Sequence, residues 1–114
     1  MDSRIDVVIG LMKAKIAEPL SSEELARAVN LSTSRLRHLF KSETGVALKQ
    51  YQKSLRMQLA QTLLARTFLT VKEITIRVGM RDPGRFVRDF KVACGLTPTQ
   101  YRKLHRKIAK PATK

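Results

Sequence analysis

The sequence has little of what disulfide-rich, membrane-spanning or metal-binding proteins need. It has one cysteine, no tryptophan, and aromatic residues at only 5% of its 114 positions. A single cysteine cannot form an internal disulfide, which is typical of a reducing cytoplasm, so we expect a cytoplasmic protein. No apolar run approaches the roughly 20 residues of a membrane-spanning helix, and we expect no membrane partner. Two histidines, His38 and His105, and Cys94 are too scattered to suggest a metal site.

Groups that usually carry catalysis are missing as well. There is no glycine-rich phosphate loop, and the acids Glu24, Glu73 and Asp82 stand where helix caps are expected. Cys94 lies beside a predicted helix end in an apolar context, which favours a buried, inert thiol over a reactive one. We therefore expect no enzyme, no cofactor and no metal.

Acidic residues are scarce: 9 Asp and Glu stand against 23 Lys and Arg, for a net charge of +14 and a pI near 10.8. An excess this large on a folded domain favours a polyanionic partner, with nucleic acid first. A solvated cationic surface and binding to an anionic membrane are the alternatives that composition alone leaves open.

The sequence is rich in residue patterns that start, continue and end helices. In its first half these patterns predict a helix-turn-helix. Apolar residues at helical spacing predict a helix over 3–17, ended by Pro19. Ser21, with Glu24 three residues later, has the form of a capping box and starts a second helix, which stops at Asn30. Ser32 caps a third helix that ends near Gly45. Two helices joined by such a short turn have helix-turn-helix geometry.

A long central helix follows over residues 47–66, without glycine or proline. Twenty residues make a rod of about 30 Å. Helical spacing gives it one apolar face, predicted from Leu48, Tyr51, Leu55, Leu59 and Ala60, with Thr62 and Leu63 close by.

The helix-turn-helix pattern then returns. Thr70 and Glu73 repeat the capping box at an offset of 49 residues, and the later landmarks, from Phe40 onward, repeat at an offset of 50. Asp82 with Pro83 at the first helical position starts the equivalent of the third helix. Its predicted inward residues are Phe86, Phe90 and Ala93, Gly95 ends it, and a last helix runs from Thr97 to about Lys107.

The predicted fold is all-α, with about seven helices and two helix-turn-helix units joined by the long central helix. We expect one domain over residues 1–108, divided into a first unit (1–46), the shared linker helix (47–66) and a second unit (67–108). Residues 109–114 are expected to be a flexible basic tail.

In a helix-turn-helix the second helix lies in the major groove, and its outward N-terminal residues reach base edges. Arg37 in the first unit and Arg88 in the second are the best candidates for bidentate contacts to guanine. The full set of predicted base contacts is Ser34, Arg37, His38, Pro83, Gly84, Arg85, Val87 and Arg88. The predicted phosphate contacts, which position without reading sequence, are Arg35, Lys41, Lys49, Lys53, Arg56, Arg81, Lys91 and Arg102.

These motifs carry a resemblance to a known family. The order Glu-Leu-Ala, Leu-Phe-Lys, Gly and Tyr, then Val-Gly, Phe-Lys and Gly-Leu-Thr-Pro-Thr-Gln-Tyr-Arg, resembles the AraC/XylS family of bacterial transcription regulators over residues 5–106. The resemblance implies seven helices and promoter binding through two successive major grooves. It also implies that the domain is monomeric and often recruits RNA polymerase, and it places the family's base-contacting positions on the base contacts named above.

The sequence departs from the family pattern at Thr75, Met80, Ala47 and Pro83-Gly84. Ala47 replaces the usual cap of the central helix. Pro83-Gly84 replaces polar residues, so we expect the second unit to specify sequence less strongly.

The leading hypothesis is a sequence-specific transcription regulator, more often an activator in such families. The alternatives are a nonspecific or architectural DNA-binding protein, and the DNA-targeting part of an enzyme such as a repair methyltransferase. A stand-alone regulator and a C-terminal domain of a longer one, where a dimer is an option, are both compatible with these residues.

Overall fold

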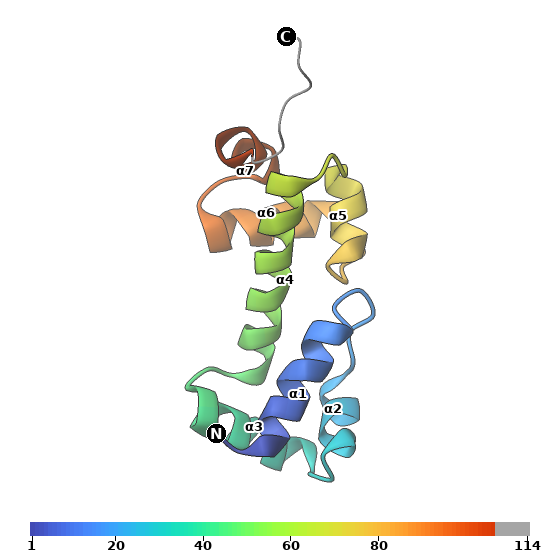
Figure 1. The fold of residues 1–114 in the computed structure, drawn as a ribbon, viewed down its shortest axis with the longest axis vertical. Coiled ribbons are helices and arrows are strands. Elements are labelled where there is room, and N and C mark those ends of the chain that lie inside the picture. Colours follow the sequence, from blue (N-terminus) through green and yellow to red (C-terminus); the bar gives the residue numbers. More distant parts are fainter. Residues whose placement is uncertain (107–114) are drawn as a thin grey trace. The chain divides into compact units, whose positions relative to one another are not determined.

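The computed structural model describes residues 1–106, and within this range the chain forms seven helices and no strand (Figure 1), which confirms the predicted fold class. The helices are α1 (Ser3–Ala14), α2 (Ser22–Ala28), α3 (Thr33–Thr44), α4 (Leu48–Arg66), α5 (Val71–Arg77), α6 (Pro83–Cys94) and α7 (Pro98–His105). They form two compact units, Met1–Leu55 and Arg56–Lys114, so α4 contributes residues to both. The predicted tail at 109–114, and the end of the last helix at Lys107, lie outside the described residues.

The predicted capping boxes start the first helix of each helix-turn-helix. In the first unit, Ser21 Oγ accepts from the Glu24 N–H at 3.1 Å and the Glu24 carboxylate accepts from the Ser21 N–H at 2.9 Å. Thr70 and Glu73 form the same pair at 3.0 and 2.8 Å. Each box accepts hydrogen bonds from backbone N–H groups that the start of a helix would otherwise leave without a partner. Such a cap stabilises the fold by about 1 kcal/mol.

The tight turns depend on residues that tolerate a left-handed backbone. Asn30 lies in the turn between α2 and α3 at φ 58°, and Gly79 takes its place between α5 and α6 at φ 84°. Such φ values favour glycine and are tolerated by asparagine. In the second unit Arg81 separates Met80 from the cap residue, whereas in the first unit the cap Ser32 follows Leu31 directly. The change of repeat offset from 49 to 50 is therefore one extra turn residue.

The first unit is built on a core shared by α1, α2, α3 and the start of α4, with the first three helices gathered together in Figure 1. Partly buried side chains, among them Leu39 and Tyr51, surround it. Phe40 is fully buried and meets the Tyr51 ring edge-on, with 5.3 Å between ring centroids. The fully or nearly fully buried residues of this core are Ile5, Val8, Met12, Leu25, Ala26, Leu36, Phe40 and Leu48.

The second unit repeats this arrangement with other residues. Phe90 is fully buried and meets the Tyr101 ring edge-on at 5.5 Å, fifty residues after the equivalent pair. Thr75 is fully buried, and its hydroxyl donates to the Val71 carbonyl at 2.8 Å. The other buried residues of this unit are Met57, Ala60, Leu64, Ala65, Ile74, Val78, Phe86 and Pro98.

Three details of the prediction were wrong. The first helix ends at Ala14 rather than residue 17: Lys15 takes a non-helical φ of −115° and ψ of 32°, and Met12 is the last buried residue of α1. Ala93 is exposed; the burial spacing from Phe90 is four residues, which turns Cys94 inward instead. Thr62 is exposed too, because it lies two positions from both Ala60 and Leu64, on the far side of α4.

Candidate nucleic-acid interface

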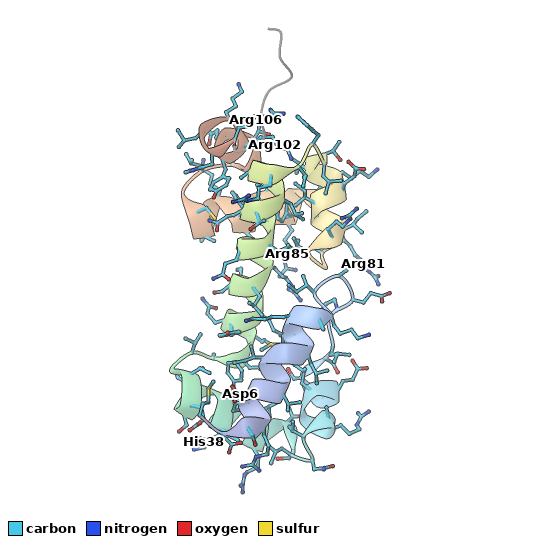
Figure 2. All side chains as sticks on the ribbon, in the orientation of Figure 1. Asp6, His38, Arg81, Arg85, Arg102 and Arg106 are labelled. Carbon is cyan, nitrogen blue, oxygen red and sulfur yellow. The ribbon has the colours of Figure 1, made fainter. Side chains whose placement is uncertain are left out.

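The candidate interface of the first unit is the outer face of α3. Ser32 caps this helix by accepting from the Arg35 N–H at 3.1 Å. Leu36 and Phe40 are fully buried and, with the partly buried Leu39, fix the inner face, so the helix turns its opposite face outward. The predicted contacts Ser34, Arg35, Arg37, His38 and Lys41 are all exposed, and His38 is labelled in Figure 2.

The candidate interface of the second unit is the outer face of α6. Asp82 caps the helix through its carboxylate, which accepts from the Gly84 N–H at 2.9 Å, and Pro83 takes the first helical position as predicted. Phe86 and Phe90 are fully buried on the inner face. The outer positions Pro83, Gly84, Arg85, Arg88 and Lys91 are exposed, whereas Val87 is half-buried.

Arg85, on the outer face of α6, has an acidic neighbour on the same helix. Arg85 Nε lies 3.9 Å from a carboxylate oxygen of Asp89 one turn later, a distance at the outer limit of an ion pair. Its side chain is 71% exposed, so this pair is worth little to stability. A ligand with negative charge can therefore compete for the guanidinium at small cost.

Around these helices, the predicted phosphate contacts fall into two groups. Exposed cations form the larger group, which comprises Arg35, Lys41, Lys49, Lys53, Arg81 and Lys91. The structure brings Lys41 and Lys49 together with Arg37 at a hollow of about 330 Å³ whose floor includes Ala47 and Leu48. Three cations around one hollow make a strongly positive local field.

Arg56 and Arg102 form the second group because both are half-buried. Burial lowers the pKa of Arg56 from its ordinary value, and the positive charge of Arg85 adds to this effect. Arg102 (Figure 2) donates from Nε to the Leu64 carbonyl at 3.0 Å and from Nη2 to the Leu69 carbonyl at 2.6 Å. Arg102 thus closes the end of α4 in addition to any phosphate contact.

Sequence reasoning missed two features of this surface. The hollow at Lys41 and Lys49 was not predicted, although the two lysines flank the Gly45 turn and so had to come close. The structural role of Arg102 was missed as well. The sequence carried no signal for it: Gln52, fifty residues earlier, approaches the Leu20 carbonyl at 3.5 Å in the equivalent way, but that contact too is seen only in the structure.

Within residues 1–106, no group of three or more His, Cys, Asp or Glu side chains could hold a metal ion, and no helix is long and apolar enough to cross a membrane. Cys94 is half-buried, and its sulfur accepts from Gln61 Nε2 at 3.2 Å. Burial raises the pKa of this thiol, which keeps it protonated and weakly nucleophilic at neutral pH.

Known proteins share both the sequence pattern and this geometry. A helix-turn-helix domain family model matches residues 25–104. The transcriptional activator RhaR of Mannheimia succiniciproducens is 31% identical over 100 residues, which are 88% of this chain and 36% of that protein. The transcriptional regulator YtdP of Bacillus subtilis is 30% identical over 103 residues, 90% of this chain and 13% of that protein. The chain thus spans well under half of the length of either relative.

Solved structures agree. An AraC-type DNA-binding domain protein of Chromobacterium violaceum superposes with a TM-score of 0.86 at 28% identity, covering 92% of this chain and 94% of that one. The DNA-binding domain of AdpA, solved in complex with a target DNA, superposes with a TM-score of 0.84 at 28% identity, covering 89% and 91%. With its two capped helix-turn-helix units and these matches, the chain belongs to the AraC/XylS family of helix-turn-helix DNA-binding domains.

Proposed function

We propose that this chain is the sequence-specific DNA-binding part of a bacterial transcription regulator, and that α3 and α6 enter successive major grooves of promoter DNA. The observation that carries the proposal is the same in both units. The second helix of each helix-turn-helix is fully buried on one side, at Phe40 and Phe90, and presents exposed arginines on the other. A helix with this arrangement can approach base edges with its outer side while its inner side stays packed in the core.

The base-reading roles are proposed for Ser34, Arg37, His38, Pro83, Gly84, Arg85, Val87 and Arg88. In the first unit Arg37 supplies the bidentate donor for guanine, with Ser34 and His38 beside it. In the second unit Arg88 does so, and Val87, half-buried, offers an apolar contact of the kind that suits a thymine methyl group.

The phosphate contacts are proposed for Arg35, Lys41, Lys49, Lys53, Arg56, Arg81, Lys91 and Arg102. The net charge of +14 supports a large share of backbone contacts in the total affinity. Such contacts release counterions, so the affinity should fall steeply with salt.

The domain division of residues 1–46, 47–66 and 67–108 is proposed on the same grounds, with α4 as the element that sets the spacing of the two recognition helices. Its 19 residues make a helix of about 28 Å, close to the roughly 34 Å of one turn of DNA. The proposed role in activation rests on the activator names of relatives such as RhaR, and the proposed contact with RNA polymerase rests on the family resemblance. We further propose a monomeric, non-catalytic domain that acts in the cytoplasm.

The test is selection from a random duplex library, followed by affinity measurements on the selected site and on a scrambled one. We expect Arg37→Ala and Arg88→Ala each to cost about 1–3 kcal/mol on the selected site and clearly less on scrambled DNA. Lys13→Ala, which removes an exposed cation from α1, is the matched control and should act equally on both DNAs.

Equal losses on both DNAs for Arg37→Ala and Arg88→Ala would reject base reading. If selection also returned no motif, the second candidate function, nonspecific or architectural binding, would stand instead. That candidate is favoured by the overall charge and predicts a steep dependence on salt without dependence on sequence.

A further inference from the structure

The first turn of α6 carries a glycine beside an arginine side chain. A Cβ atom added to Gly84 would lie 3.7 Å from Nη1 of Arg88 and 3.3 Å from Oδ1 of the cap residue Asp82. The Arg88 side chain therefore runs back along the helix by one turn, and its guanidinium ends beside the bare backbone of Gly84. Long helical side chains take this direction, toward the helix N-terminus.

The first unit is different at the equivalent positions. Fifty residues earlier, Ser34 stands where Gly84 does and His38 stands where Arg88 does. In the first unit both positions carry a side chain, each shorter than that of arginine, and both side chains are exposed. In the second unit one long side chain covers two positions, its own and that of the glycine one turn before it.

We propose that Gly84 is a specificity-determining position, because its missing side chain leaves Arg88 the space over the first turn of α6. Arg88 then presents its guanidinium to the base pair that faces position 84, at the end of the helix that reaches deepest into a major groove. The expected partner is guanine, whose O6 and N7 accept the two parallel bonds of an arginine. The inference rests on the proposed function and assigns the glycine a positioning role within it.

The two distances separate the effects of two substitutions. In both Gly84→Ala and Gly84→Leu, the new Cβ meets the Asp82 carboxylate at 3.3 Å, so the cap must shift by a few tenths of an ångström. At 3.7 Å from Arg88 Nη1, the alanine methyl makes an ordinary contact and leaves the guanidinium in place. The branched leucine side chain needs the space that the guanidinium fills. Gly84→Ala is therefore the matched control for Gly84→Leu.

The experiment is random-library selection with the unmodified chain, Gly84→Ala, Gly84→Leu, Arg88→Ala and the double variant Gly84→Leu with Arg88→Ala. Thermal unfolding of each variant checks the fold. We expect Arg88→Ala to abolish the preference for guanine at one position and to lower affinity for the selected site about 10- to 100-fold. Gly84→Leu should abolish the same preference, Gly84→Ala should weaken it less than Gly84→Leu does, and the double variant should resemble either of its component single variants rather than lose twice as much.

Three results would overturn the inference alone while leaving the proposed function intact. The first is an unchanged preference at that position in Gly84→Leu, and the second is additive losses in the double variant. Loss of preference in the half-site read by the first unit would also contradict it, because displacement of Arg88 is local. Failure of the unmodified chain to select any motif would reject the inference together with the proposed function.

Discussion

The two halves of this chain share a scaffold and differ in the face that they present. The capping boxes, the left-handed residue in the turn and the edge-on Phe–Tyr pair recur at offsets of 49 and 50 residues. On the outer face, by contrast, Arg37 is replaced by Val87 and His38 by Arg88. The residues that the two units share are those that pack in the cores and shape the turns, whereas the residues that face solvent differ between the units.

The largest expected effect tests whether the two cores are equivalent. Phe40→Ala and Phe90→Ala should each lower the free energy of unfolding by about 3–5 kcal/mol, because each removes a fully buried ring and its aromatic contact. Chemical denaturation followed by circular dichroism measures this. Val92→Ala, at a side chain that is 84% exposed, is the control and should change stability by less than about 0.5 kcal/mol. A loss below about 1 kcal/mol for either phenylalanine would break the equivalence.

The next effect should separate the halves. Arg102→Ala removes three hydrogen bonds, to the carbonyls of Leu64, Thr67 and Leu69, and should cost about 2 kcal/mol of unfolding free energy. Gln52→Ala removes a single bond of 3.5 Å and should cost under about 1 kcal/mol. Arg102→Lys keeps the charge but not the forked geometry of the guanidinium. Its melting temperature should therefore lie nearer to that of Arg102→Ala than to that of the unmodified chain. Similar losses for Arg102→Ala and Gln52→Ala would show that the charged side chain adds nothing.

A smaller effect is expected when α4 is given the kind of N-terminal cap that α7 already has. Ala47 stands where the second unit has Thr97, whose hydroxyl accepts from the Gln100 N–H at 3.2 Å in a complete capping box. Gln50 already occupies the matching position of α4. Ala47→Thr should therefore raise the free energy of unfolding by about 1 kcal/mol, and Thr97→Ala should lower it by a similar amount. A destabilised Ala47→Thr variant in the same denaturation assay would contradict this account of the cap.

The smallest effect concerns acid. The backbone N–H of Ser21 donates to Glu24, and that of Thr70 to Glu73, which lowers the pKa of each carboxyl below its ordinary 4.5. Because the pKa is lower in the folded state, the stabilisation is complete above the unfolded value and is lost as pH falls through the folded one. Stability should thus decrease from about pH 5 downward. In the double variant Glu24→Gln with Glu73→Gln, an uncharged amide oxygen can accept the same backbone bonds in both capping boxes. The stability of this variant should depend less on pH over that range. An equal pH dependence would show that Glu24 and Glu73 are not the groups responsible.

Much of the scaffold could be predicted because its signals are local. The caps Ser21, Thr70 and Asp82 and the turn residues Asn30 and Gly79 depend only on neighbours within a few residues, and all five were predicted in their roles. The exposed faces of α3 and α6 followed from helical periodicity for the same reason.

What escaped prediction depends on contacts between distant segments. Nothing near Arg102 in the sequence indicates that it binds carbonyls more than thirty residues earlier. The exposure of Ala93 and of Thr62 depends on which side of a helix meets its neighbours, and periodicity alone cannot place that side when apolar residues are spread around the helix.

Footprinting can test whether the two units read two successive grooves. Hydroxyl-radical footprinting on the selected site should show protection over roughly 20 base pairs, in two patches about one helical turn apart. Arg37→Ala should weaken the patch under the first unit, and Arg88→Ala the patch under the second. A single protected patch, unchanged in extent by either substitution, would contradict the account and leave α4 as packing between two units of which only one binds DNA.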